Sequence, residues 1–336
     1  MRTWLRRLAM LILIAILVLL GWLLWDLYHP TSLPAAGVKV PIRLGSSVDI
    51  SIRELQRKGL LSSPWLFRLL WQIDGRPPLQ AGLYLFRGRV DMTDVLGTLR
   101  AGRTQPLNFT IVPGMNLAQV YQRLQNAPYL ARTDIPPAEQ LPELLGAMAA
   151  TQENAEGCLL PQSYRYVPGE PALTILRQSA RAMQQTLQKL WPKRAGDLPL
   201  SSPYQALILA SIVQREGAPQ AQQQRIAAVF LNRLRAGMPL QSDPTVIYAL
   251  GKAYDGHLKP TQMQVQSPYN TYLHGGLPPT PIAMPSEQAL QAVLHPAPGD
   301  DLYFIAKDNE YHYSKGFTEH QQQIQRYLQS GTKNDG

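Results

Sequence analysis

The acid with the most suggestive position in the chain is Glu216, which lies in the segment ASIVQREGAP (residues 210–219). Upstream of it, Ser202 and Pro203 are residue types favoured at the start of a helix, and apolar side chains then cover almost every helical face. Gly217 follows the acid and can take the left-handed conformation that ends a helix. The pattern predicts a buried helix that begins after Ser202 and ends at Glu216.

A carboxyl group at that position is favoured in its protonated form. It faces the negative pole of the helix and apolar walls, and both disfavour the charged carboxylate. An acid that keeps its proton near neutral pH can serve as a general acid. From this segment alone, a surface glutamate at a frayed helix end, paired with Arg215, is also an open interpretation.

Sequence motifs for several other chemistries are absent. The chain has no H-E-x-x-H, G-x-S-x-G, Walker or G-x-G-x-x-G pattern. Its six histidines show no metal-ligand spacing, and we expect them in loops and on the surface, with His320 near the entry of a helix. The single cysteine, Cys158, excludes an intramolecular disulfide framework and a cysteine-rich metal site. We therefore expect neither a metal nor a cofactor.

Three segments combine aromatic rings with amide, hydroxyl and carboxyl groups: EGCLLPQSYRY from residue 156, QSDPTVIYALG from residue 241 and SPYNTYLHGGLPPTPI from residue 267. Flat aromatic faces with polar groups suit a sugar chain better than a phosphate or an apolar ligand. Asp243 precedes a proline and could instead be an ordinary helix cap. The candidate substrate-binding or supporting residues are Glu156, Tyr164, Gln241, Asp243, Tyr269, Asn270 and Tyr272.

The N-terminus has the pattern of a membrane anchor. Three arginines, at positions 2, 6 and 7, precede an apolar run from Leu8 to Trp25, and aromatic residues at its far end are typical of a membrane interface. The positive-inside rule places the N-terminal stub in the cytoplasm and the remaining chain outside. The alternative is a cleaved signal peptide, but this apolar run is longer than a usual signal core.

Composition limits the possible partners. The net charge of +9 and the sequence pI near 9.6 favour an anionic partner or surface. However, the arginines are scattered and no nucleic-acid-binding motif is present, so we expect no nucleic acid partner. With 336 residues, of which 45% are hydrophobic, the chain is long enough for about two folded domains beyond the anchor.

The predicted elements indicate an α+β fold. Three segments in the first part each show a strand, a glycine turn and an amphipathic helix, with Ser47, Thr93 and Asn116 as helix starts. Such units resemble glycan-binding LysM modules, or they are packing units of one α+β domain. In the second part we expect five helices, at 174–190, 204–216, 220–236, 286–294 and 318–328, and a hairpin formed by residues 302–306 and 311–314, joined by a KDNE turn.

The boundaries follow from these patterns. We expect a cytoplasmic stub at 1–7, a transmembrane helix at 8–28, a linker at 29–38, a LysM-like domain at 39–130 and a catalytic domain at 131–336.

Four longer segments of the chain form specific motifs: ASIVQRE, VFLNRLRAGMPLQSDPTVIYALG, SPYNTYLHGGLPPTPI and DLYFIAKDNEYHYSKGFTEH. Together they resemble the YceG-like family of endolytic murein transglycosylases. The resemblance covers most of the chain, and the motifs are long and specific. It implies that Glu216 is the catalytic acid/base, being the last acid of the family's A-S-I-V-x-x-E pattern. It also implies cleavage of the β-1,4 bond between N-acetylmuramic acid and N-acetylglucosamine in nascent peptidoglycan, leaving 1,6-anhydro ends.

The resemblance further implies an inner-membrane location with an extracytoplasmic catalytic domain, and cell-wall synthases as partners. Three departures from the family pattern put details of substrate contact in question. The family carries Glu where Gln214 stands, Asp-Thr at 162–163 and Asn-Pro-Gly at 284–286. Two other interpretations stay open: a hydrolase that uses Glu156 or Asp243 as a second carboxylate, and a non-catalytic glycan-binding scaffold.

Overall fold

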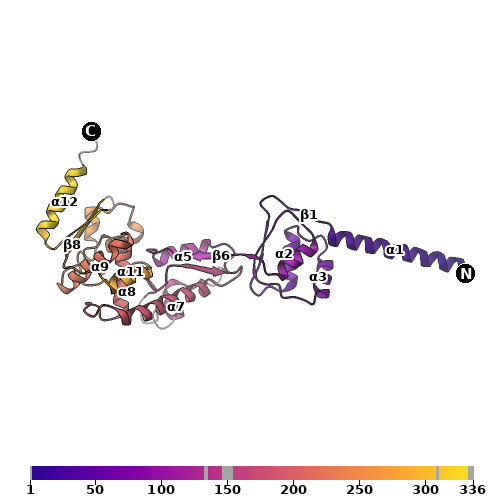
Figure 1. Ribbon diagram of the computed structural model, residues 1–336, viewed down its shortest axis with the longest axis horizontal. Helices are drawn as coiled ribbons and strands as arrows, with labels where there is room; N and C mark the ends of the chain where they lie inside the picture. Colours follow the sequence, from indigo (N-terminus) through magenta and orange to yellow (C-terminus); the bar gives the residue numbers. More distant parts are fainter. Residues whose placement is uncertain (1, 132–134, 146–153, 308–309, 332–336) are drawn as a thin grey trace. The chain divides into compact units, whose positions relative to one another are not determined.

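The computed structural model describes residues 2–131, 135–145, 154–307 and 310–331 (Figure 1). The chain divides into two compact units. The first comprises residues 1–109, 127–134 and 165–172, and the second comprises residues 110–126, 135–164 and 173–336. The mixture of helices with small antiparallel sheets confirms the predicted α+β class.

The first unit begins with α1 (Arg2–Tyr28). Within it, the 25-residue stretch Trp4–Tyr28 is long and apolar enough to cross a membrane, and an 18-residue window inside it has a mean hydropathy of 2.9. The chain then returns to the body of the unit, because β1 (Thr31–Ser32) pairs with β4 (Arg89–Val90). The segment predicted as a linker is therefore in part a paired strand.

The core of the first unit lies between one sheet and three helices. The sheet has the order β2-β3-β5 and is antiparallel, with Val38–Ile42, Gly82–Phe86 and Thr104–Gln105 as its strands. The helices are α2 (Val48–Arg57), α3 (Pro64–Ile73) and α4 (Met92–Arg100). Their apolar faces bury one continuous cluster that includes Val40, Leu55, Phe67 and Val95.

Two of the three predicted helix starts in this part agree with the structure. Ser47 is the N-cap of α2, and Asn116 accepts a hydrogen bond from the Gln119 amide at 2.9 Å just before α5 (Leu117–Asn126). The prediction for Thr93 was wrong. Asp91 caps α4 instead, because its carboxylate accepts from the Asp94 amide at 2.8 Å in a reciprocal capping box.

The second unit contains the remaining helices and a hairpin. The strands β6 (Leu107–Thr110) and β7 (Ser163–Tyr166) pair with each other. The helices of this unit are α5, α6 (Leu141–Leu145), α7 (Ala172–Leu190), α8 (Pro203–Arg215), α9 (Gln220–Arg235), α10 (Asp243–Leu250), α11 (Glu287–Leu294) and α12 (Phe317–Gly331). The antiparallel hairpin is formed by β8 (Tyr303–Lys307) and β9 (Glu310–Ser314). The predicted turn at 308–309 lies outside the described residues.

The buried helix α8 is the centre of the second unit. It packs against α9 and α11, and its residues 206–213 are all buried. Ser202 caps its N-terminus by accepting from the Gln205 amide at 3.2 Å, which confirms the predicted start. Because α8 is enclosed on nearly every side, the residue at its C-terminal end is held by the packing of the whole unit.

Candidate active site

Glu216 is the residue at which α8 ends. Its backbone is still helical, and its amide donates to the Ile212 carbonyl at 3.0 Å. Gly217 follows with a φ of +71°, the left-handed conformation that turns the chain away. The neighbouring Arg215 donates to the Gly114 carbonyl at 3.3 Å, and no ion pair joins it to Glu216 among the described residues. The helix therefore delivers one carboxyl group, held at its negative end.

The surroundings of this carboxyl group favour the protonated form. Burial is the main cause that raises the pKa of Glu216 to about 7, and the negative charge of Asp243 adds to it. Two groups act in the opposite direction: the Ser242 hydroxyl, which donates to Glu216 Oε1 at 2.6 Å, and the guanidinium of Arg233. A pKa near neutrality allows one group to donate a proton and then accept one at the same pH.

Glu216 opens into a cavity of about 330 Å³. One side comes from the loop and helix start after Leu240, and the other from the hairpin and α12. Both aromatic rings and hydrogen-bonding groups line the wall, as expected for a site that binds a sugar ring. The lining residues are Glu216, Arg233, Leu240, Gln241, Asp243, Tyr272, Tyr303, Phe304, Phe317 and His320.

The buried guanidinium of Arg233, on α9, forms hydrogen bonds with both sides of this cavity. Its Nε donates to the Leu302 carbonyl at 2.6 Å, at the entry to the hairpin. Its Nη1 donates to the Leu240 carbonyl at 2.9 Å and to the Pro239 carbonyl at 3.2 Å. The same nitrogen reaches the Gln241 side chain at 3.2 Å. Gln241 needs such support, since its φ of +49° is unfavourable for a residue with a side chain.

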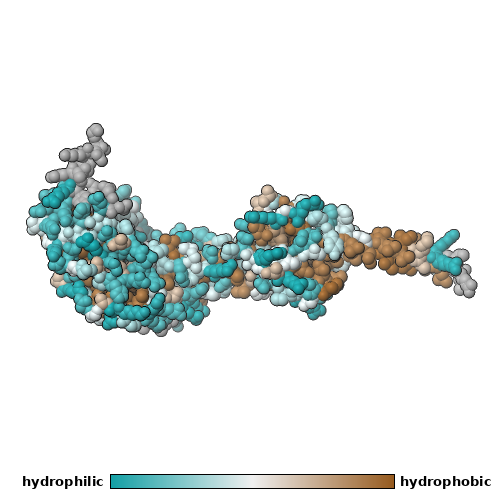
Figure 2. All heavy atoms as spheres, viewed as in Figure 1, coloured by the Kyte–Doolittle hydropathy of each residue, from teal (hydrophilic) through white to brown (hydrophobic). Residues whose placement is uncertain are grey.

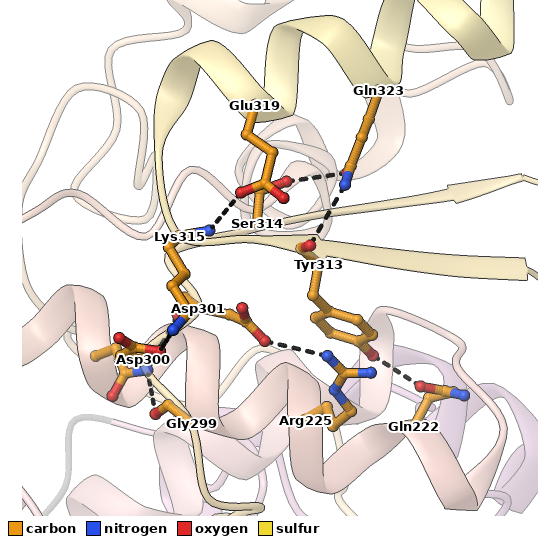
Figure 3. Close-up of polar contacts among 11 residues, drawn as sticks. Gln222, Arg225, Gly299, Asp300, Asp301, Tyr313, Ser314, Lys315, Glu319 and Gln323 are labelled. Atoms are coloured by element: carbon orange, nitrogen blue, oxygen red, sulfur yellow. Dashed lines mark hydrogen bonds and ion pairs between the residues drawn. The ribbon is translucent and has the colours of Figure 1, made fainter.

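The hairpin and α12 are fixed to α9 by a separate set of polar contacts (Figure 3). Arg225 pairs with Asp301 at 3.1 Å and lies over the ring of Tyr313, whose hydroxyl donates to Gln222 at 2.9 Å. The Ser314 hydroxyl donates to Gln323 of α12 at 2.9 Å. These contacts hold in place the aromatic wall that the hairpin and α12 contribute to the cavity.

Three of the candidate substrate-binding or supporting residues lie in the same cavity as Glu216. Gln241, Asp243 and Tyr272 all line its cavity, and the Tyr272 hydroxyl donates to Asp243 Oδ1 at 2.5 Å. Asp243 is the first residue of α10, and Ser242 is the N-cap position before it. The carboxylate of Asp243 is therefore a wall group of the cavity, with Tyr272 as its partner.

Tyr269 and Asn270 lie outside that wall and support the loop. Asn270 is fully buried, and its amide donates to the carbonyls of Met263 and Val265 at 2.9 Å each. The Tyr269 hydroxyl is within 2.8 Å of the Thr280 hydroxyl. Both residues connect distant parts of a long loop, and so they position Tyr272 rather than line the cavity.

Glu156 lies in a second cavity, of about 380 Å³. Its carboxylate accepts from the Leu117 amide at 2.9 and 3.1 Å, at the start of α5, and from the Tyr248 hydroxyl at 3.2 Å. Burial raises its pKa to about 7 despite these hydrogen bonds. Tyr164 lines neither cavity: it is buried, and its hydroxyl donates to the Leu160 carbonyl at 2.6 Å.

Gln214 and Ser286, which belong to two of the three departures from the family pattern, contact each other. Gln214 Oε1 accepts from the Ser286 amide at 3.1 Å and from its hydroxyl at 2.7 Å. At the third departure, the Ser163 hydroxyl is 2.8 Å from that of Thr110. These residues hold backbone segments around α8 and β7 together and are absent from the lining of the Glu216 cavity.

Sequence reasoning missed several lining residues. Arg233 had a usable signal, since it is a basic residue on a helix face that is otherwise apolar. His320 was placed near a helix entry, and it does lie in the first turns of α12, where its ring stacks on Tyr303 at 5.1 Å. Burial, helped by the charge of Arg233, lowers the pKa of His320. Its Nδ1 is buried and has no hydrogen-bond partner among the described residues.

The fold and site define an α+β protein with an N-terminal apolar helix and one near-neutral acid in an aromatic and polar cavity. The YceG-like family model matches residues 40–326, and the chain belongs to this family.

Known relatives agree with that assignment. An endolytic murein transglycosylase from Bacillus subtilis (strain 168) is 30% identical over 311 residues, which cover 87% of this chain and 85% of the relative. One from Streptococcus pneumoniae serotype 2 is 27% identical over 326 residues, covering 87% of this chain and 59% of the relative. A crystal structure of a YceG-like protein from Listeria monocytogenes matches with a TM-score of 0.58 and 27% identity, over 86% of this chain and 99% of that one.

Proposed function

We propose that this protein is an endolytic lytic transglycosylase that cleaves the β-1,4 bond between N-acetylmuramic acid and N-acetylglucosamine in nascent glycan strands and leaves 1,6-anhydro ends. It is an enzyme of the murein transglycosylase type, as its relatives are named. The observation that carries the finer proposal is the carboxyl group of Glu216, whose pKa is about 7 and which lines a cavity that also contains aromatic rings and hydrogen-bonding groups. Such cleavage terminates the elongation of a strand.

One carboxyl group is enough for this reaction. In the first step, protonated Glu216 gives its proton to the glycosidic oxygen as the bond from that oxygen to C1 of the muramic acid breaks. In the second step, the resulting carboxylate takes the proton of the C6 hydroxyl on the same sugar, whose oxygen forms a bond to C1. The acid is regenerated and no water is consumed. A hydrolase, in contrast, normally needs a second carboxylate to activate water or to attack the sugar.

The remaining wall would hold the sugar so that its C6 hydroxyl approaches C1. The rings of Tyr303, Phe304 and Phe317 offer flat apolar faces, and Gln241 and His320 offer hydrogen-bonding groups. Holding reacting atoms in near-attack geometry supplies a large part of the rate of such intramolecular steps. We assign these residues to positioning and Glu216 alone to proton transfer.

The pH dependence of cleavage should follow the pKa of Glu216. Because the reaction starts from the protonated acid, the rate should fall as the pH rises through about 7. In Ser242→Ala the carboxylate loses a hydrogen bond that favours its charged form, so the pKa of Glu216 should rise, and the falling limb should move to higher pH.

Asp243→Asn is the matched variant, in which the pKa of Glu216 should change in the opposite direction. It removes a negative charge that raises the pKa of Glu216, so the falling limb should move to lower pH. The measurement is the rate of strand cleavage from pH 5 to pH 9 for the parent and both variants. If the falling limbs of the three pH–rate profiles coincide, or if those of both variants move in the same direction, a group other than Glu216 controls the rate.

The endolytic part of the proposal is tested with long, uncrosslinked glycan strands and the full chain in detergent. We expect the mean strand length to drop early, before short products accumulate, because cuts fall inside the strands. Release of disaccharides from the outset would show attack at strand ends. Strands that are bound but left intact would favour the scaffold interpretation instead.

A hydrolytic mechanism is the second candidate, and one observation favours it. The carboxylate of Asp243 lines the same cavity as Glu216, so a second acid is present near the reacting bond. Its hydrogen bond with Tyr272 and its position at the start of α10 are also what a wall residue would show. The chemical nature of the new strand ends distinguishes the two mechanisms.

The membrane helix determines where the reaction takes place. We propose that α1 is a retained anchor in the plasma (inner) membrane, with its arginine-rich end in the cytoplasm and both compact units outside, near the synthases that polymerise new strands. We further propose that the first unit binds glycan as LysM modules do. A reporter active only in the cytoplasm, fused to the C-terminus, should give no signal. A strong signal would reverse the orientation.

A further inference from the structure

The outer face of α3 carries an apolar stripe that the rest of the chain leaves uncovered. Trp65, Leu69 and Ile73 are spaced four residues apart, so they share one helical face, and they are 53%, 43% and 75% exposed. The opposite face is buried, since Leu66 and Phe67 belong to the core of the first unit. In Figure 2 the surface of this unit is hydrophobic over α3. A helix that is apolar on both faces is expected to contact something on its outer side.

This stripe is joined to the end of the membrane helix. The ring of Trp65 stacks on that of Trp22 in α1, with the centroids 6.4 Å apart. The Ser62 hydroxyl, just before α3, donates to Asp26 of α1 at 2.5 Å. Leu23 and Leu27 of α1 pack against the same core cluster that α3 helps to form. The last turns of α1 and the start of α3 therefore form one structure.

We propose that α3 lies on the membrane that α1 spans, with its Trp65–Leu69–Ile73 stripe among the lipid headgroups and the first acyl carbons. Trp22 and Trp25 are at the end of α1, where aromatic residues of a spanning helix meet the interface, so contact with Trp22 places Trp65 at the same depth. The polar residues near the stripe fit this position. Arg68 and Arg76 are exposed; Arg68 pairs with Asp49 at 2.6 Å, and Arg76 can reach anionic headgroups.

Lipid fits this face better than a protein partner does. The stripe begins beside a helix end that must leave the bilayer, so a protein seated on it would have to displace lipid from around Trp22 and Trp65. The contact also limits the motion of the first unit. β1 pairs with β4 directly after α1, so the unit is attached to the anchor at two places and would rest on the membrane surface through a third.

The test uses the full chain with the buried Cys158 replaced by alanine, in vesicles of phosphatidylcholine and phosphatidylglycerol. A fluorescent probe is attached to a single cysteine introduced at Leu69 or Ile73, and the control probe is placed at the exposed Gln288 of α11. Nitroxide-bearing lipids report contact with the membrane, and iodide reports contact with water. Because the stripe is exposed, neither substitution disturbs the core, and circular dichroism confirms folding.

We expect the probes at 69 and 73 to be quenched several-fold more by the nitroxide lipids than the control, and several-fold less by iodide. Two further substitutions should reverse this pattern while α1 stays inserted. They are Trp65→Glu with Ile73→Glu when the probe is at 69, and Trp65→Glu with Leu69→Glu when the probe is at 73. Probes that iodide reaches as easily as the control would overturn the proposal. Probes that neither quencher reaches would also overturn it, since a protein surface would then cover the stripe. Neither result depends on glycan cleavage, so the proposed enzymatic function is tested separately.

Discussion

Glu216→Gln is expected to reduce strand cleavage to near background with the fold intact. General acid/base assistance is worth about 10²–10⁴-fold in rate, and more when one group serves both proton transfers. Glutamine keeps the shape of the side chain and can still bond to Ser242, but it cannot transfer a proton. The variant should therefore bind glycan strands as the parent does.

The stability of this variant should change in a defined direction. In the parent, burial holds the pKa of Glu216 near 7, above its value in the unfolded chain, so ionising it in the folded protein is unfavourable. Stability from this source is present at low pH and is lost as the pH rises through about 7. Glutamine cannot ionise, so Glu216→Gln should melt at the parent's temperature at pH 5 and at the same or a higher temperature at pH 8.

Glu156→Gln is the matched control, because it makes the same change at a second buried acid whose pKa is also near 7. Its amide oxygen can still accept from the Leu117 amide, and its cavity is separate from that of Glu216. We expect a much smaller loss of rate than in Glu216→Gln. Cleavage by the Glu216 variant at close to the parent's rate would remove Glu216 from the mechanism, and a large loss in the control would make Glu156 the next candidate.

Arg233→Ala is expected to have the largest effect on stability. It removes the donor for three backbone carbonyls, those of Pro239, Leu240 and Leu302, of which the one at Leu240 is buried with its partner. Each acceptor left without a partner costs about 1–3 kcal/mol, so the second unit should lose about 3 kcal/mol or more. The loop at Gln241 and the hairpin would separate, and cleavage should fall with them.

The comparison for this prediction is Arg235→Ala, on the same helix. Arg235 is exposed and pairs with the exposed Asp197, so its removal should cost less than about 1 kcal/mol. Urea unfolding followed by circular dichroism measures both variants, with the loss expected in the transition of the second unit alone. Equal midpoints for the two variants would show that Arg233 does not hold the cavity together.

The local features of the site could be predicted from sequence. The start and end of α8, the burial of its middle and the position of its final acid all follow from short-range rules: an N-cap serine, a first-turn proline, apolar side chains on most faces and a left-handed glycine. The hairpin followed from two short alternating segments. Each of these features is decided by residues that are neighbours in the chain.

The composition of the cavity could be predicted only in part, because it depends on tertiary packing: besides Glu216, Gln241, Asp243 and Tyr272 were candidates, and the other lining residues were not. Ser242 and Arg233 act on Glu216 only because α9 and α10 pack around the end of α8, and His320 reaches the cavity only through the hairpin. Glu156 and Tyr164 belong to a segment with the same polar and aromatic composition as the segments of Gln241 and Tyr272. However, Glu156 lies in a separate cavity and Tyr164 lies in the core. Composition alone does not distinguish a wall residue from a supporting one.

The most direct test of the single-acid mechanism is the fate of water during cleavage. Purified glycan strands are digested by the full chain in water labelled with heavy oxygen, and the new ends are analysed by mass spectrometry. We predict 1,6-anhydro ends, lighter than reducing ends by the mass of one water molecule and free of heavy oxygen, because the C6 hydroxyl of the sugar is the nucleophile. Reducing ends that carry the heavy isotope would contradict this mechanism and make Asp243 the acid to examine as the second carboxylate.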